Sequence, residues 1–220
     1  MRVRIFHLHT LSAALLCASG AAIAGAQDDA KGFVEGSALT MQNRVLIEQL
    51  DYQKGSSFRA TSGKRGQTLA RESAFGLMLN YESGYTRGVL GLGLDAHAYG
   101  AVNLGTEADH ARATPRYVAK DGQDILDSFG RAGAALKVRV SSTELKAGEM
   151  RTKTPIFSSS DTRLLPESNR GWQVISKDIP TLTLQAGRFT GWADRNARKN
   201  GADLLANYSG MTSGSFSFIG

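Results

Sequence analysis

The chain alternates apolar and polar residues over short segments, which are joined in turn by tight turns and long polar connections. The clearest segment is 129–140. Its odd positions include Arg131, Lys137 and Arg139, and its even positions from 132 onward are alanine, leucine and valine. A β-strand has a side-chain period of two residues, so one face of this strand is aliphatic and the other basic. This pattern is typical of outer-membrane β-barrels, in which the aliphatic face meets lipid and the polar face lines the interior.

The same alternation predicts an all-β, antiparallel transmembrane β-barrel with about seven or eight strands in this chain. Connections between the strands alternate between long and tight, and no helical segment of a doubly wound α/β fold is visible. A β-sandwich remains an alternative, because alternation alone does not distinguish lipid from a protein core. The predicted strands are 37–53, 72–82, 85–98, 129–140, 143–151, 171–176 and 181–190, with a weaker candidate at 204–209.

The N-terminus has the features of a cleavable signal peptide. Arg2 and Arg4 precede an apolar stretch that begins at 11–16, and small residues at 22–24 and 24–26 fit the small-x-small cleavage rule. We therefore expect residues 1–26 to be a signal peptide and residues 27–220 to be the N-terminal part of an outer-membrane barrel domain. A membrane anchor is the alternative, but the stretch is shorter than the about 20 residues that span a bilayer.

Composition limits the other classes of function. The formal charge of +6 falls to +4 when Arg2 and Arg4 are removed, and no dense Lys/Arg run or nucleic-acid-binding motif is visible. The only cysteine, Cys17, lies in the signal segment, and the histidines His97 and His110 lack metal-ligand spacing. We expect no enzyme activity, no metal, no cofactor and no nucleic-acid partner, and a location in the outer membrane of a Gram-negative bacterium.

Four longer stretches resemble the OprD-type family of substrate-specific outer-membrane porins. They are GFVEGSALTMQNR, LNYESGYTRGVLGLGLDAHAYG, KVRVSSTELKAGEMRTKTPIFSSSDTRLLPES and WQVISKDIPTLTLQAGRF, and the resemblance covers nearly all of residues 32–200. The resemblance implies an eighteen-stranded monomeric barrel about twice this length, of which the chain is the N-terminal part. It also implies uptake of small carboxylate-bearing solutes, such as amino acids or organic acids, and a loop after the fifth strand that folds inward. Here that loop is 152–169.

Facilitated diffusion of a carboxylate needs cations on the pore wall that replace part of the lost hydration. The candidate pore-lining residues are Arg131, Lys137 and Arg139 on one face of the fourth strand, and Lys146 on the fifth. An alternative is that these charges only solvate the interior and pair with Glu144 or Asp95.

The inward loop supplies three further candidates for the constriction: Asp161, Arg163 and Glu167. Acidic groups there would favour solutes that also carry an amine, whereas a solvated loop tip is the alternative. Trp172 and Trp192 lie near strand ends, where they suit an interfacial aromatic girdle or packing under a loop.

The expected partners are outer-membrane lipid, lipopolysaccharide and small anionic or zwitterionic solutes, with a monomeric pore. Three alternatives remain at this stage. The first is a truncated, non-functional porin fragment. The second is a soluble exported β-rich solute-binding protein, and the third is an adhesin barrel without conductance.

Overall fold

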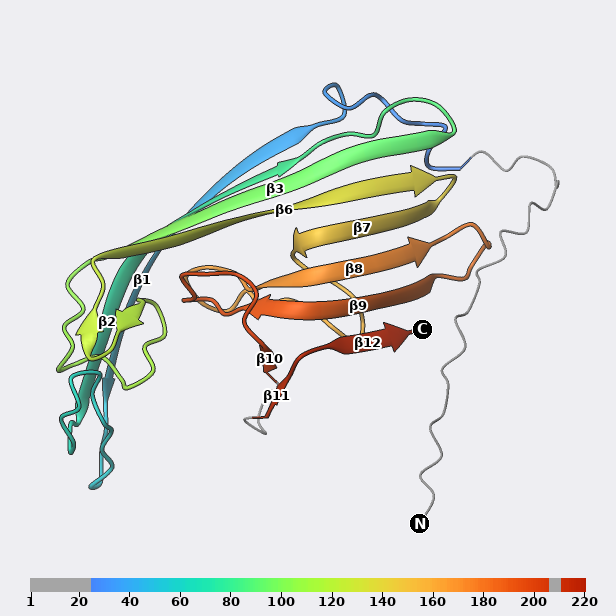
Figure 1. Cartoon of the computed structure of the whole chain (residues 1–220). Coiled ribbons are helices and arrows are strands. Elements are labelled where there is room, and N and C mark those ends of the chain that lie inside the picture. Colours follow the sequence, from blue (N-terminus) through green and yellow to red (C-terminus); the bar gives the residue numbers. More distant parts are fainter. Residues whose placement is uncertain (1–24, 206–210) are drawn as a thin grey trace, which may run out of the picture.

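The structure is a computed structural model that describes residues 25–205 and 211–220. The predicted signal peptide therefore lies almost entirely outside the described residues. Strands dominate the described chain, in which we find no helix with the length and apolar character needed to cross a membrane. Eight of the strands form one antiparallel sheet, which Figure 1 shows as a strongly curved wall.

Each strand of this sheet pairs with its neighbour along the chain. The order is β1 (Ala38–Asp51), β2 (Leu69–Glu82), β3 (Leu90–Asn103), β6 (Ser128–Val140), β7 (Thr143–Met150), β8 (Ser168–Ser176), β9 (Leu184–Ala193) and β12 (Phe216–Ile219). The long connections contain two small ribbons: β4 (Lys120–Asp121) with β5 (Asp124–Ile125), and β10 (Leu204–Leu205) with β11 (Thr212–Ser213). The predicted antiparallel fold is confirmed, and the sheet forms part of a barrel wall with β1 and β12 as its edges.

The two faces of the sheet differ in the way that the alternation predicts. Leu39, Met41 and Ile47 on β1 project from the outer face with 70%, 68% and 79% of their surfaces exposed. Exposed aliphatic side chains at successive outward positions suit a lipid environment. The opposite, inner face carries polar residues such as Arg44 and Lys137, and the long loop 151–167 folds onto it.

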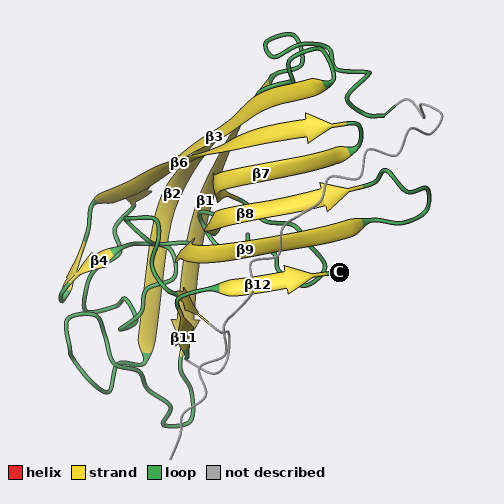
Figure 2. Cartoon of the chain, turned by 45° about the vertical axis from the view of Figure 1, so that its right-hand side comes forward, coloured by secondary structure: helices red, strands yellow, loops and turns green. Residues whose placement is uncertain are grey.

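Long and short connections lie at opposite ends of the strands, as Figure 2 shows. The short ones are 83–89, 141–142 and 177–183, and the long ones are 52–68, 104–127, 151–167 and 194–215. Outer-membrane barrels have this arrangement, with short turns on the periplasmic side and long loops outside.

Two predicted strands start too early. The third strand begins at Leu90 rather than 85, because Tyr85 turns onto the inner face and Gly88 adopts a φ of 106°. The seventh begins at Leu184 rather than 181, because Thr181 has a φ of 67° in the left-handed region. A side chain in that region does not continue a strand.

The weak eighth strand predicted at 204–209 is described only at its first two residues. Leu204 and Leu205 form only the short ribbon strand β10, and residues 206–210 lie outside the described part. The eighth strand of the sheet is instead β12, which pairs with β9 through Phe216 opposite Phe189. Both rings lie in one aromatic cluster with Phe157 of loop 151–167, and this packing favours the strand at 216–219.

Loop 151–167 is attached to the sheet by apolar packing. Leu164 and Leu165 are fully buried in a cluster with Met78 of β2 and Tyr99 of β3. Gly76 makes the close approach possible, since a Cβ there would lie 2.8 Å from Cγ of Leu164. The loop is therefore folded inward, as the family resemblance implies, with its polar residues held above the inner face.

Candidate functional site

The four predicted pore-lining cations lie together on the inner face. Arg131, Lys137 and Arg139 lie on the same face of β6, six and then two residues apart, and Lys146 lies on β7 directly opposite Lys137. Arg131 and Lys137 are almost fully buried, whereas the outward Leu136 between them is 66% exposed. Two neighbouring strands thus form one basic stripe.

Asp95 on β3 neutralises part of this stripe. Its carboxylate lies 2.6 Å from Nζ of Lys137 and also pairs with Nζ of Lys146. Nζ of Lys146 lies 3.9 Å from a carboxylate oxygen of Glu144 as well. A buried ammonium group without a partner would carry a large desolvation cost, and the ion pairs with Asp95 offset part of this cost for both lysines. The pairing that we considered as an alternative for these lysines is present.

Arg139 belongs to a cluster at the short-turn end of the strands. Its guanidinium lies over the ring of Tyr85, 3.9 Å from the ring centroid, and its Nε donates to Oε1 of Gln27 at 3.0 Å. The hydroxyl of Tyr85 donates to Glu144. Burial, together with the neighbouring Glu144 carboxylate, raises the pKa of Tyr85 far above its ordinary value. Tyr85 therefore stays neutral and orients both charged neighbours.

Arg131 holds two loops at the other end of the stripe. Its guanidinium donates to the backbone oxygen of Pro166 and, at 3.2 Å, to that of Ala197, and it lies 5.6 Å from the ring centroid of Tyr99. The carbonyl oxygens come from loops 151–167 and 194–215. Arg131 thus has a structural role, because it holds both loops in place, in addition to contributing positive charge to the interior.

The first predicted constriction residue, Asp161, ties its loop to the far edge of the sheet. Arg44 on β1 donates from Nη1 and Nη2 to the two carboxylate oxygens at 2.6 and 3.0 Å, and Arg151 donates at 3.0 Å. Nη1 of Arg44 also donates to the carbonyl oxygen of Arg163 at 2.9 Å. Burial opposes ionisation of Asp161, but the hydrogen bond from Arg44 and the charge of Arg151 outweigh it and lower its pKa.

Arg163 and Glu167, the other two, differ in how they are held. Glu167 accepts from the backbone nitrogen of Ser160 at 2.9 Å and lies 3.3 Å from Nε of Arg195. For the guanidinium of Arg163, we find no hydrogen-bond or ion-pair partner among the residues that the structure describes. Burial and the positive charges of Arg195 and Arg116 lower the pKa of Arg163, and the carboxylates of Asp194 and Glu72 offset only part of this effect.

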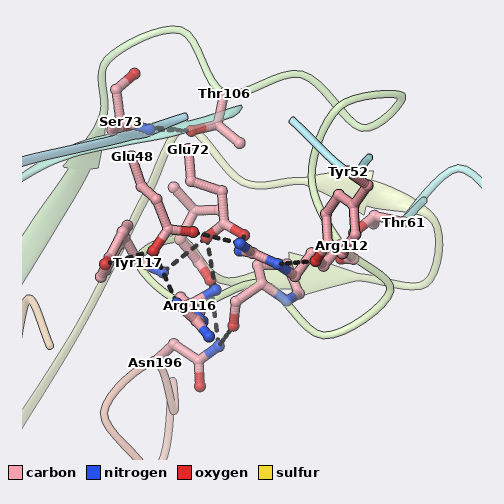
Figure 3. Close-up of polar contacts among 12 residues, drawn as sticks. Glu48, Tyr52, Thr61, Glu72, Ser73, Thr106, Arg112, Arg116, Tyr117 and Asn196 are labelled. Atoms are coloured by element: carbon pink, nitrogen blue, oxygen red, sulfur yellow. Dashed lines mark hydrogen bonds and ion pairs between the residues drawn. The ribbon is translucent and has the colours of Figure 1, made fainter. Parts of the chain in front are cut away.

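A buried acid network fixes loop 104–127 to β1 and β2 (Figure 3). Glu72 is almost fully buried and accepts from Nη1 of Arg112 at 3.0 Å and from the backbone nitrogens of Arg116 and Tyr117 at 2.6 and 3.0 Å. Glu48 pairs with Arg112 and accepts from Nη1 of Arg116 at 2.8 Å. Sequence reasoning missed this network, although the polar face of the first strand and the basic residues of the loop were visible.

The loop after β9 joins the same end of the interior. Asn196 donates to the carbonyl oxygen of Pro115 at 2.9 Å, as Figure 3 shows in part, and Arg195 donates to the hydroxyl of Thr162 at 3.1 Å. Loops 104–127, 151–167 and 194–215 are therefore cross-linked to one another over the inner face.

The two tryptophans separate into the two roles that we considered. Trp172 lies on the outer face, 43% exposed, where it suits a lipid interface. Trp192 instead packs against the cluster that contains Phe189, as the loop residue Phe157 also does.

Known proteins share both the sequence and this architecture. Residues 31–220 match the family described as "outer membrane porin, OprD family". Porin D of Pseudomonas aeruginosa is 36% identical over 194 residues, which are 88% of this chain and 41% of that protein. The P. aeruginosa OpdK structure with vanillate has a TM-score of 0.70 at 33% identity, covering 86% of this chain and 45% of OpdK. The structure of P. aeruginosa OccK2 in complex with glucuronate has a TM-score of 0.65 at 30% identity, covering 86% of this chain and 42% of OccK2.

The curved sheet, its outward aliphatic face and its inward-folded loop are features of the wall of an outer-membrane β-barrel. The chain belongs to the OprD family of porins, whose members are channels of the Gram-negative outer membrane and not enzymes. It spans less than half the length of the relatives that it matches. Family membership does not favour the soluble binding protein that we considered from the sequence.

Proposed function

We propose that this chain supplies part of the wall and the constriction of a channel for passive uptake of small carboxylate-bearing solutes, such as amino acids or organic acids. The observation that carries the proposal is the guanidinium of Arg163 on the inward-folded loop, for which the described residues supply no hydrogen-bond or ion-pair partner. Two related channels of known structure hold vanillate and glucuronate, both of which are carboxylates.

The physical argument rests on replaced hydration. A carboxylate that enters a narrow pore loses water, and a guanidinium offers two parallel N–H donors that match its two oxygens. Among the residues of 25–205 and 211–220, none forms a hydrogen bond or an ion pair with the guanidinium of Arg163, so it can make this pair, whereas Arg44 beside it is bound to Asp161. Farther along the inner face, the stripe of Arg131, Lys137, Arg139 and Lys146 extends the positive potential. Its cations are already paired or hydrogen-bonded, so each would hold a passing anion only weakly, as conduction requires.

The outer face supports the remaining parts of the proposal. Exposed aliphatic residues along β1 and the outward Trp172 suit contact with outer-membrane lipid, and the long-loop end suits contact with lipopolysaccharide. We propose that the pore acts as a monomer. An adhesin barrel is the competing function, and it would leave bilayers without conductance.

Ion-current recordings in planar bilayers test the proposal on the channel isolated from outer membranes. We expect small carboxylates to interrupt the current of the native channel and Arg163→Gln to weaken this block about tenfold, as loss of one charge-assisted pair implies. Arg65→Gln, at an exposed position of loop 52–68, is the matched control and should leave the block unchanged. A native channel that carries current without any block by carboxylates would refute the proposed substrate class.

A further inference from the structure

A pocket lies on the inner face, next to the start of loop 151–167. Its lining includes Asn80, Asp95, His97, Tyr99, Lys146 and Glu149, and Arg151 closes it at the start of the loop. The side chains come from β2, β3 and β7, so the pocket is built on the sheet itself. None of the interactions described for the constriction uses His97 or Glu149.

Three buried polar atoms in this pocket lack hydrogen-bond partners within the described residues, and one of them, Oδ1 of Asp95, lies 2.6 Å from Nζ of Lys137 in an ion pair. The other two are Nε2 of His97, whose side chain is more than nine-tenths buried, and Oε2 of Glu149, which is buried to a similar degree. The other oxygen of Glu149 accepts from the hydroxyl of Ser168 at 2.7 Å, and Nε of Arg170 lies 3.4 Å from Oε2. Buried polar groups are normally hydrogen-bonded, so both atoms call for a ligand or water.

The two side chains face the same small space. A Cβ at Gly133 would lie 2.6 Å from Cγ of Glu149 and 2.7 Å from Cε1 of His97, so the glycine leaves room for both. The imidazole ring stacks on Tyr99 with 4.6 Å between centroids, which fixes its orientation. His97 and Glu149 are therefore preorganised next to one another.

We propose that His97 and Glu149 form a subsite for a hydrogen-bond donor, a hydroxyl or an ammonium group, on the transported solute. Glu149 only accepts hydrogen bonds as a carboxylate, and a neutral imidazole accepts at its unprotonated nitrogen. The cations Lys146 and Arg151 line the same pocket and would hold the solute's carboxylate. This inference rests on the proposed function and narrows its substrates to acids that carry a second, donating group.

Three probes of equal carbon number test the subsite: propionate, 3-hydroxypropionate and β-alanine. Block of the ion current by each is measured on the channel isolated from outer membranes. We expect the native channel to bind 3-hydroxypropionate and β-alanine about tenfold more tightly than propionate. His97→Phe keeps the ring stacked on Tyr99 and should remove this preference for both. Glu149→Gln keeps an acceptor for Ser168 and should reduce the affinity for β-alanine more than that for 3-hydroxypropionate.

Matched controls come from the exposed pair His110 and Glu107 in loop 104–127, 3.3 Å apart. His110→Phe and Glu107→Gln should leave all three affinities unchanged. Heat-modifiability on gels shows that each variant has folded, and Glu149→Gln alone tests the subsite if His97→Phe does not fold. Equal affinities for the three probes in the native channel would overturn the subsite but leave the proposed function intact. No block by any probe would remove the proposed function itself.

Discussion

Arg44 on the first strand of the sheet holds both carboxylate oxygens of Asp161, 117 residues later in the chain, at 2.6 and 3.0 Å. The pair joins the edge strand β1 to the inward-folded loop, so the loop spans the inner face from β7 to β1. Arg151 shares the same carboxylate at 3.0 Å. The position of Arg163, two residues along, depends directly on this attachment.

Breaking the attachment should make the constriction mobile. In Arg44→Gln the loop keeps its apolar anchor but loses the bidentate pair, so we expect noisier current and a higher mean conductance. The pair is partly exposed, and its contribution to stability is about 1 kcal/mol or less. Single-channel recordings measure the effect. Arg87→Gln, which breaks a contact with the carbonyl oxygen of Lys31 far from the loop, should behave as the native channel.

The same pair predicts a dependence on acid. The pKa of Asp161 is lowered in the folded protein, so its ion pairs stabilise the loop above the ordinary pKa of 3.8. This stabilisation is lost as the pH falls through the lowered value. We expect native current noise to be constant from pH 7 to 5 and to rise below about pH 4. Asp161→Asn should be noisy at every pH. A native transition centred above pH 5 would contradict this assignment.

Glu72 should protect loop 104–127 from proteolysis. Replacing the buried carboxylate by an amide in Glu72→Gln removes an ion pair with Arg112 and weakens the acceptor for the nitrogens of Arg116 and Tyr117. Breaking a buried pair costs about 3–5 kcal/mol, and the remaining bond from Arg112 to Glu48 reduces that cost. We expect trypsin to cleave after Arg112 and Arg116 much faster than in the native channel. Glu107→Gln in the same loop should not change the cleavage rate.

A charged substitution on the outer face should lower the stability of the folded channel more where the side chain contacts lipid. Leu136 on β6 and Val34 before β1 are exposed to similar extents, 66% and 70%. Leu136→Arg places a guanidinium among outward strand residues and should destabilise the folded channel by up to about 2–4 kcal/mol. Val34→Arg lies outside the strands and should cost less than about 0.5 kcal/mol. Urea titration of the channel in lipid vesicles measures both, and equal losses would argue against lipid contact at Leu136.

Strand faces could be predicted from the sequence because the period of two is a local property. Arg131, Lys137 and Arg139 therefore lie on the face that the alternation assigns them. Partners could not be predicted in this way. Asp95 lies between Lys137 and Lys146 only because β3, β6 and β7 are neighbours in a particular register.

The last strand of the sheet, β12, was not predicted, for a related reason. Alternation of serine and phenylalanine at 215–218 says nothing about which face is buried, and Phe216 and Phe218 turn inward. Their partner, Phe157, lies on a loop about 60 residues earlier, and local patterns do not contain such contacts. The network around Glu72 was missed because its partners are 40 to 45 residues away.

The residues of loop 151–167 that attach it to the sheet, Leu164 and Leu165, differ from those that carry its charge. These two side chains hold the loop on Met78 and Tyr99 by apolar contact alone, while the charges that would meet a solute sit at neighbouring positions such as Arg163. Attachment of the loop and selectivity for the solute thus depend on different residues, only one position apart. We expect a relative with the same leucines but other charged residues to keep the position of the loop and the diameter of the pore. Its solute selectivity would differ, so selectivity can evolve in this loop without changes in the barrel wall.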